Sequence, residues 1–226
     1  MEQKITSEGK CIYCQKTFAQ KDITKHLTVH LAQMEKDKKI PNPLTYCHIE
    51  VEAGEMFLHL LVKGSAKMKE IDDFLREIWL ECCGHMSAFR HKPTEIPMNQ
   101  IVKEVFLPKT KIQHEYDFGS TTTVFLKAHK QYQLSFKNTI LLLSRNEPLK
   151  LLCATCKKNA ATSLCTVCQC NEYSFFCNSC AKKHTNTCDD FSDYSQMQVV
   201  NSPRMGECGY TGGSIDVERD GVYKKN

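Results

Sequence analysis

Short stretches rich in apolar, β-branched and aromatic residues recur between residues 44 and 150 and are separated by polar residues, and this pattern predicts β-strands. LTYCHIEVE (44–52) and EMFLHLLVK (55–63) are the first two stretches, and Gly54 between them favours a tight turn. Further strands are predicted at HMSAFRH, KIQHEYDF, TTTVFLKAH and NTILLLS. Strands in this order favour a mostly antiparallel sheet.

Between residues 66 and 83 the pattern changes, because apolar residues recur at steps of three and four. This period predicts one main amphipathic helix of about four turns. Its apolar face consists of Met68, Ile71, Phe74, Leu75, Ile78, Trp79 and Cys82. Gly84 follows and favours the end of the helix. The helix and the strands together predict an α+β fold.

Changes in composition divide the chain into four blocks. Residues 1–40 combine a short Cys/His unit with a charged helix, and residues 44–150 carry the α+β pattern. Residues 153–188 are dense in cysteine. Residues 189–226 are polar and rich in glycine, and we expect the last of them to be flexible.

The composition bounds the location and class of the chain. It has 226 residues, 41% of them hydrophobic, and a net charge of +4, which is too weakly basic to imply nucleic acid by itself. No secretory segment follows Met1 and no apolar run is long enough for a membrane span. We therefore expect a cytoplasmic protein, with leaderless export as the alternative. In a reducing compartment its 14 cysteines favour metal ligation over disulfides.

The first block contains Cys11-x2-Cys14 followed by His26-x3-His30. A CxxC turn places two thiolates on one side of a tetrahedral ion, and a helix presents histidines four residues apart on one face. Apolar residues at 18 and 23 supply the small core that such a unit needs. The pattern resembles a two-Cys, two-His zinc finger, with either a docking role or a nucleic-acid role.

The third block carries four regularly spaced pairs of metal ligands. They are Cys153 and Cys156, Cys165 and Cys168, Cys177 and Cys180, and His184 and Cys188. Eight ligands suit two closed tetrahedral zinc sites. Interleaved pairing joins the first pair to the third and the second pair to the fourth, as in the cross-braced modules called B-box, MYND and HIT-type fingers. Sequential pairing is the alternative.

Other interpretations of the cysteine-dense block are less favoured. Cys170 is left over and could replace Cys168 as a ligand. A disulfide framework competes only outside a reducing compartment, and no βαβ context supports a redox CxxC. A catalytic zinc keeps an open position, whereas these ligand sets are full. We therefore expect about three structural Zn²⁺ ions per chain, and hence small zinc-stabilised modules at both ends of the α+β domain.

Three further stretches, together with the cysteine-dense block, carry a family resemblance. They are WLECCGHMSAF (79–89), HEYDFGSTTTVFL (114–126) and VVNSPRMGECGYTG (199–212). The chain from about residue 44 to 213 resembles the plasmid pRiA ORF-three-like domain family, whose members are often labelled insertion-element passenger proteins of the TnpR type. The resemblance implies a compact α+β domain in a prokaryotic, intracellular protein. It implies no reaction.

A few residues outside the cysteine clusters are weak catalytic candidates. His85, Asp117 and Arg204 could form a pocket for an enzyme reaction or a small anion if they converge. The alternative is structural: a histidine that caps a helix, an aspartate that holds a turn and an arginine in a packed tail. We expect a zinc-binding interaction protein, with a protein partner or nucleic acid, and no small-molecule cofactor. An enzyme remains the alternative.

Overall fold

The computed structural model describes residues 7–36, 42–168 and 175–214. The chain forms two compact units. Residues 6–76 and 85–147 form the sheet unit, and residues 1–5, 77–84 and 148–226 form the cysteine-rich unit. Each unit is described by itself.

A seven-stranded antiparallel sheet is the centre of the sheet unit, with the strand order β6-β5-β7-β8-β3-β4-β9. The strands are β3 (Leu44–Ala53), β4 (Met56–Lys63), β5 (Ser87–His91), β6 (Thr94–Ile96), β7 (Lys111–Tyr116), β8 (Thr122–Leu134) and β9 (Ile140–Arg145). The predicted α+β class with a mostly antiparallel sheet is confirmed. The short strand β6 was not predicted, because three residues are too few to show alternation.

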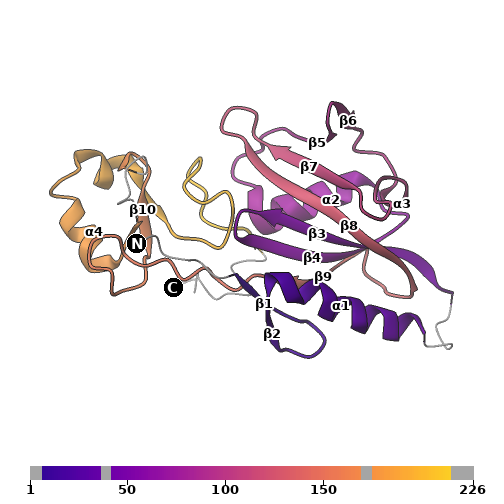
Figure 1. Ribbon diagram of the computed structural model, residues 1–226. Coiled ribbons are helices and arrows are strands. Elements are labelled where there is room, and N and C mark those ends of the chain that lie inside the picture. The colour runs from indigo at the N-terminus through magenta and orange to yellow at the C-terminus, as the bar shows by residue number, and fades with distance from the viewer. Residues whose placement is uncertain (1–6, 37–41, 169–174, 215–226) are drawn as a thin grey trace. The chain divides into compact units, whose positions relative to one another are not determined.

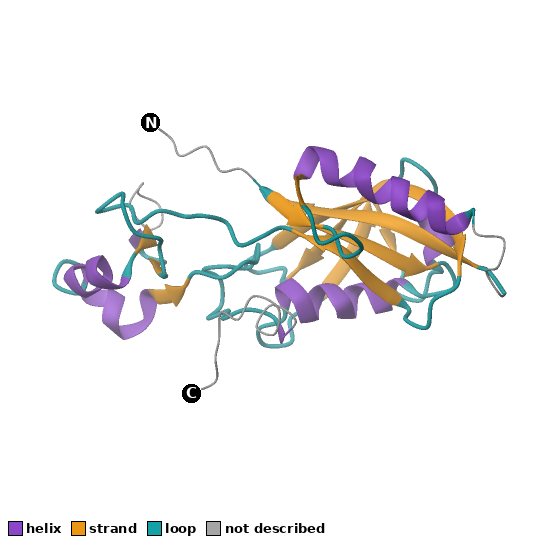
Figure 2. Ribbon diagram, turned by 90° about the horizontal axis from the view of Figure 1, so that it is seen from below, coloured by secondary structure: helices purple, strands orange, loops and turns teal. Residues whose placement is uncertain are grey.

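Helices cover the two faces of this sheet (Figures 1 and 2). Helix α1 spans Gln20–Glu35, and α2 spans Met68–Leu75. The predicted main helix continues beyond α2 as a π-helical turn, Arg76–Leu80, and ends there, earlier than the expected stop at Gly84. One short helix, α3 (Val102–Val105), lies between β6 and β7.

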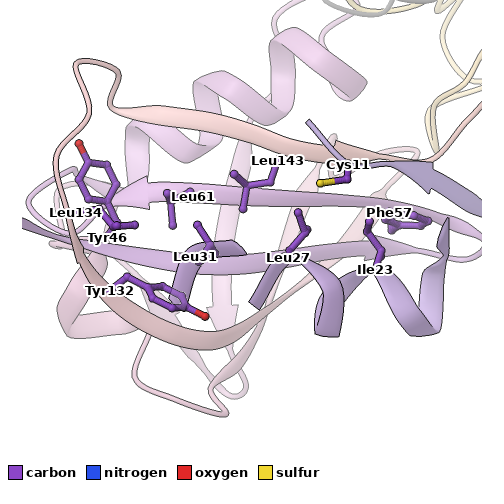
Figure 3. Close-up of a cluster of buried hydrophobic side chains, with 10 residues drawn as sticks. All are labelled: Cys11, Ile23, Leu27, Leu31, Tyr46, Phe57, Leu61, Tyr132, Leu134 and Leu143. Carbon is purple, nitrogen blue, oxygen red and sulfur yellow. The ribbon is translucent and has the colours of Figure 1, made fainter. Parts of the chain in front are cut away.

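A compact apolar cluster joins α1 to the sheet (Figure 3). Ile23, Leu27 and Leu31 recur at four-residue steps and are fully buried on one face of α1. The sheet side of this cluster is formed by Tyr46, Phe57, Leu61, Tyr132, Leu134 and Leu143. Helix α1 is therefore fixed by the packing of its apolar face on the sheet as well as by its local sequence.

The cysteine-rich unit has a much smaller framework. A three-stranded sheet has the order β11-β10-β12 and comprises β11 (Phe175–Phe176), β10 (Ser163–Cys165) and β12 (Gln196–Gln198). Helix α4 (Asn178–His184) and a π-helical turn, Phe191–Ser195, complete it. Its apolar cluster consists mostly of cysteines, with Phe176, Ala181 and Phe191 as the other buried members.

Residues 199–214 pack as an irregular segment within the same unit. Ser202 Oγ donates a hydrogen bond to the carbonyl of Trp79 at 2.6 Å, and Arg204 is fully buried. A methyl group on Gly213 would lie 2.3 Å from the carbonyl oxygen of Glu77, so the backbones approach closely here. The segment is therefore a packed tail, the structural alternative expected from its sequence.

Candidate metal centres

The N-terminal Cys/His motif folds as a β-hairpin followed by a helix. Strands β1 (Glu8–Lys10) and β2 (Thr17–Ala19) pair antiparallel, and the CxxC turn lies between them. The amide of Gln15 donates a hydrogen bond to the carbonyl of Cys11 at 2.9 Å, and Gln15 takes a left-handed conformation with φ of 59°. This tight turn brings the two thiols of the motif to the same side of the hairpin.

Four side chains gather between the hairpin and α1. They are Cys11, Cys14, His26 and His30, and one ligand atom of each lies within 4.8 Å of the others. Cys14 Sγ is 3.2 Å from His26 Nε2, and the ring of Phe18 stacks on the His26 ring at 3.9 Å. Burial and the neighbouring His30 lower the pKa of His26, which favours the neutral imidazole that metals bind.

The hairpin is also joined to the edge of the large sheet. The Ile12 amide donates to the carbonyl of Leu143 at 2.9 Å, and Gly9 forms a bridge with Asn146. A methyl group on Gly9 would lie 2.6 Å from Phe57 Cζ and 2.9 Å from the carbonyl oxygen of Arg145. This motif therefore packs against the large sheet as part of the sheet unit and is not a separate domain joined by a linker.

In the cysteine-rich unit, the ligand pairs gather in the interleaved arrangement rather than the sequential one. The first group is Cys153, Cys156, Cys177 and Cys180. Cys156 Sγ and Cys177 Sγ are 3.9 Å apart, and the Asn159 side-chain amide lies 3.8 Å from Cys177 Sγ. The turn after Cys156 repeats that of the hairpin motif, because Lys157 has a left-handed φ of 55°.

The second group is Cys165, Cys168, His184 and Cys188. Cys165 Sγ and Cys188 Sγ are 4.0 Å apart. The His184 ring stacks on Phe176 at 4.3 Å, and its Nδ1 lies 3.3 Å from Thr187 Oγ1. Its Nε2 is buried and has no hydrogen-bond partner among the described residues. A metal ion bound at Nε2 would satisfy this buried atom, while Thr187 would orient the ring.

The surroundings of the thiols make some of them easy to ionise and others hard. Hydrogen bonds from Ser179 and from the Cys180 backbone lower the pKa of Cys177 to about 5. Burial favours a higher pKa at Cys165, but the hydrogen bond with Ser195 helps to outweigh it, and the pKa falls to about 6. Burial and the adjacent thiols raise the pKa of Cys180 to about 12. A bound cation would allow all four thiolates of such a group to coexist.

All three groups can therefore hold a metal ion through four side chains each. None of the cysteines that the structure describes is in a disulfide. Cys168 lies in the second cysteine-rich group, whereas Cys170 is outside the described residues. No helix in the described part of the chain is both long and apolar enough to cross a membrane.

The three weak catalytic candidates are divided between the units. His85 Nε2 lies 3.5 Å from Asp117 Oδ2 in the sheet unit, and Asp117 Oδ1 accepts a hydrogen bond from the Gly119 amide at 3.0 Å. Arg204 belongs to the cysteine-rich unit, where its Nη2 lies 3.8 Å from Cys82 Sγ. Asp117 therefore holds a turn and also meets a histidine.

Sequence reasoning missed a buried polar network beneath α1. His48 Nε2 is 3.1 Å from His59 Nδ1, and His129 Nε2 is 2.7 Å from Glu50 Oε2. Burial and the nearby His129 lower the pKa of His48 to about 3. Strand alternation could have revealed the network, because His48 and Glu50 fall on the same face as the buried Tyr46.

A second missed network involves α2. His114 Nε2 lies 2.7 Å from Asp72 Oδ1, and the Ser87 hydroxyl donates to the same oxygen at 2.6 Å. Arg76 Nε donates to Asp72 Oδ2 at 3.1 Å. Burial alone would raise the pKa of Asp72, but these partners outweigh it and lower the pKa to about 2. The carboxylate is fully engaged, and we assign the network a structural role.

Comparisons with known proteins give no family for this chain. No family model matches it, and no curated protein matches it. A solved structure with some likeness is a protein of unknown function, MM3350 from Methanosarcina mazei Go1. It is 9% identical, covers 46% of this chain and 68% of its own, and aligns with a TM-score of 0.37, which supports no inference about function.

Proposed function

We propose that this chain is a zinc-stabilised interaction protein, in which the metal ions hold the fold and a protein partner is bound. The observation that carries the proposal is the closure of the metal groups. Each of the three groups supplies four side-chain ligands. A structural zinc uses four protein ligands, whereas a catalytic zinc keeps one position for water or substrate.

Zinc is the metal proposed because of the ligand types. Thiolate and imidazole ligands in sets of four favour zinc over calcium or magnesium, which prefer oxygen ligands. We propose about three zinc ions per chain, one for each of these groups. We also propose that the chain is related to the plasmid pRiA ORF-three-like family and that it acts in the prokaryotic cytoplasm, as that resemblance implies.

The charge of the zinc-loaded chain favours a protein partner over nucleic acid. A zinc ion with four thiolates has a charge of −2, and one with three thiolates and a histidine has −1. The two-Cys, two-His group is neutral. The formal net charge of +4 therefore falls to about +1 when the three sites are loaded. Nearby lysines such as Lys157 and Lys182 offset the negative charge of the metal centres and do not form a surplus of positive charge for nucleic acid.

A hollow beside the small sheet offers a contact surface for such a partner. It has a volume of about 640 Å³ and is lined by the start of β10 and the residues before it, by β12 and by the first residue of α4. The lining residues are Ala161, Thr162, Ser163, Asn178, Gln196, Met197, Gln198 and Val199, none of them charged. Uncharged amides and hydroxyls suit the hydrogen-bonding groups of a peptide better than phosphates.

Metal analysis and partner capture test the proposal together. The purified chain should contain about three zinc ions or more and bind no DNA or RNA at physiological salt. Crosslinking in the native host should capture a protein with the wild-type chain but not with Met197→Glu, which places a charge in the hollow. Ser192→Glu, an exposed change outside the hollow and outside the ligand groups, should still capture it. A chain without zinc, or salt-dependent retention on nucleic acid, would overturn the proposal.

A further inference from the structure

A third group of thiols lies in the cysteine-rich unit, outside the motifs described above. Cys82, Cys83 and Cys208 all belong to this unit, and their sulfur atoms lie within 4.8 Å of one another. Cys82 Sγ is 3.8 Å from Cys83 Sγ, and Cys83 Sγ is 3.4 Å from Cys208 Sγ. Neighbouring sulfurs on a tetrahedral zinc lie about 3.8 Å apart, given Zn–S bonds of about 2.3 Å. The three thiols therefore already have nearly the separation that one zinc ion requires.

We propose that these three cysteines bind a further zinc ion, with His85 as the fourth ligand. His85 is the second residue after Cys83 in the chain. Two residues span at most about 7 Å, so chain connectivity alone keeps the imidazole within reach of an ion held by Cys83. The resulting Cys3His set is of the same type as that of Cys165, Cys168, His184 and Cys188.

The backbone around these cysteines repeats a feature of the other metal groups. In the hairpin motif and in the first cysteine-rich group, the residue after a CxxC pair is left-handed, with φ of 59° at Gln15 and 55° at Lys157. Gly84, which follows Cys83, has φ of 81°, and Gly209, which follows Cys208, has φ of 66°. Glycine takes this conformation without strain, which allows the chain to turn sharply around each sulfur.

The charge at this site also fits a bound ion. Zinc with three thiolates and a neutral histidine has a net charge of −1. The guanidinium of the fully buried Arg204 lies 3.8 Å from Cys82 Sγ and supplies a positive charge in the same unit.

Zinc stoichiometry of single variants tests this site. Native mass spectrometry of the full chain should find about four zinc ions in the wild type, one per four-ligand group. Cys83→Ser and Cys208→Ser should each lose one ion. Cys47→Ala is the matched control, because Cys47 is buried in β3 and belongs to none of the metal groups. It should keep the full complement, and so should Cys208→His, which restores a ligand atom where the backbone φ of 49° is left-handed.

Three outcomes would overturn the proposal. The first is equal zinc content in the wild type and in both serine variants. The second is a disulfide between Cys83 and Cys208 in the protein purified under reducing conditions, detected as a crosslinked peptide after digestion. The third is loss of zinc from Cys47→Ala to the same extent as from the serine variants. A wild type with about three ions and unchanged variants rejects this site alone, whereas a wild type without zinc also rejects the proposed function.

Discussion

Nε2 of His26 lies 3.1 Å from Nε2 of His30, one turn further along α1. Two imidazole nitrogens on a tetrahedral zinc lie about 3.3 Å apart, given Zn–N bonds of about 2.0–2.1 Å. Without a cation, two nitrogen atoms at this separation either share one proton or repel each other. The helix therefore presents the histidines in an arrangement suited to a metal ion, and the adjoining face of the helix packs on the sheet.

Removal of metal should unfold the cysteine-rich unit and leave the large sheet folded. The cysteine-rich module has few buried side chains apart from its cysteines, so it has little core without the ions. The hairpin motif and α1 share a core with the large sheet, so the motif should lose its fixed ligand geometry while that sheet stays folded. Hydrogen exchange after treatment with a strong chelator should show loss of protection in residues 153–168 and 175–188 while β3 and β4 stay protected. Zinc should restore the protection, and a module still protected without metal would contradict this expectation.

Shortening one buried side chain of α1 should show how much the packing of this helix on the sheet contributes to stability. Leu27 is fully buried against the sheet, so Leu27→Ala should destabilise the sheet unit by about 2–5 kcal/mol. Val29 lies on the same helix and is 64% exposed, so Val29→Ala should change stability by no more than about 0.5 kcal/mol. Urea unfolding of the two variants measures the difference. Equal stabilities would mean that the helix is not held by this face.

The close contact of Gly9 with the large sheet leads to a prediction about the hairpin motif. An alanine there would overlap the ring of Phe57 and the backbone carbonyl of Arg145, and backbone atoms cannot move aside cheaply. Gly9→Ala should therefore cost about 1–3 kcal/mol and speed the release of zinc from Cys11 and its partners. Gly119→Ala is the control, because Gly119 is exposed and its nearest contact is a side-chain oxygen at 3.3 Å. Calorimetry and transfer of zinc to a colorimetric chelator give the two readouts.

Acid should destabilise the sheet unit through the buried histidines. Burial lowers the pKa of His48 to about 3 and that of His59 well below its usual value. Because these pKa values lie below the unfolded value of about 6.5, the unfolded state binds more protons in this range, and stability falls as the pH drops below about 6.5. Each histidine should contribute a slope of about 1.4 kcal/mol per pH unit between about pH 6 and its folded pKa.

Substitution of one buried histidine tests whether these histidines cause the acid sensitivity of the sheet unit. His48→Gln cannot take up a proton, so its stability should fall less steeply with acid than that of the wild type. His91→Gln, at an exposed position on β5, should leave the slope unchanged. Urea unfolding at several pH values between 4 and 8 gives the slopes. Parallel curves for the wild type and His48→Gln would assign the acid sensitivity to other groups.

The sequence by itself determined the local features of this protein. Short stretches rich in apolar residues placed β3, β4, β7 and β9 close to their observed bounds, and β3 and β4 are buried on both faces because helices cover both sides of the sheet. The regular ligand spacing marked twelve metal-binding candidates, since a CxxC turn or a pair of histidines on a helix is fixed by local geometry. The π-helical turn after Leu75 did not show in the periodicity, which continues to Cys82.

The tertiary structure decided which distant groups meet. Spacing permitted two pairings of the cysteine-rich ligands, and only the folded chain gathers them in the interleaved one. The anchoring of α1 on the sheet depends on buried surfaces of strands far away in the sequence. Cys83 and Cys208 are separated by 125 positions, and no local pattern relates them. Their proximity follows from the packing of residues 199–214 on residues 77–84, for which the close contact at Gly213 and the hydrogen bond from Ser202 are responsible.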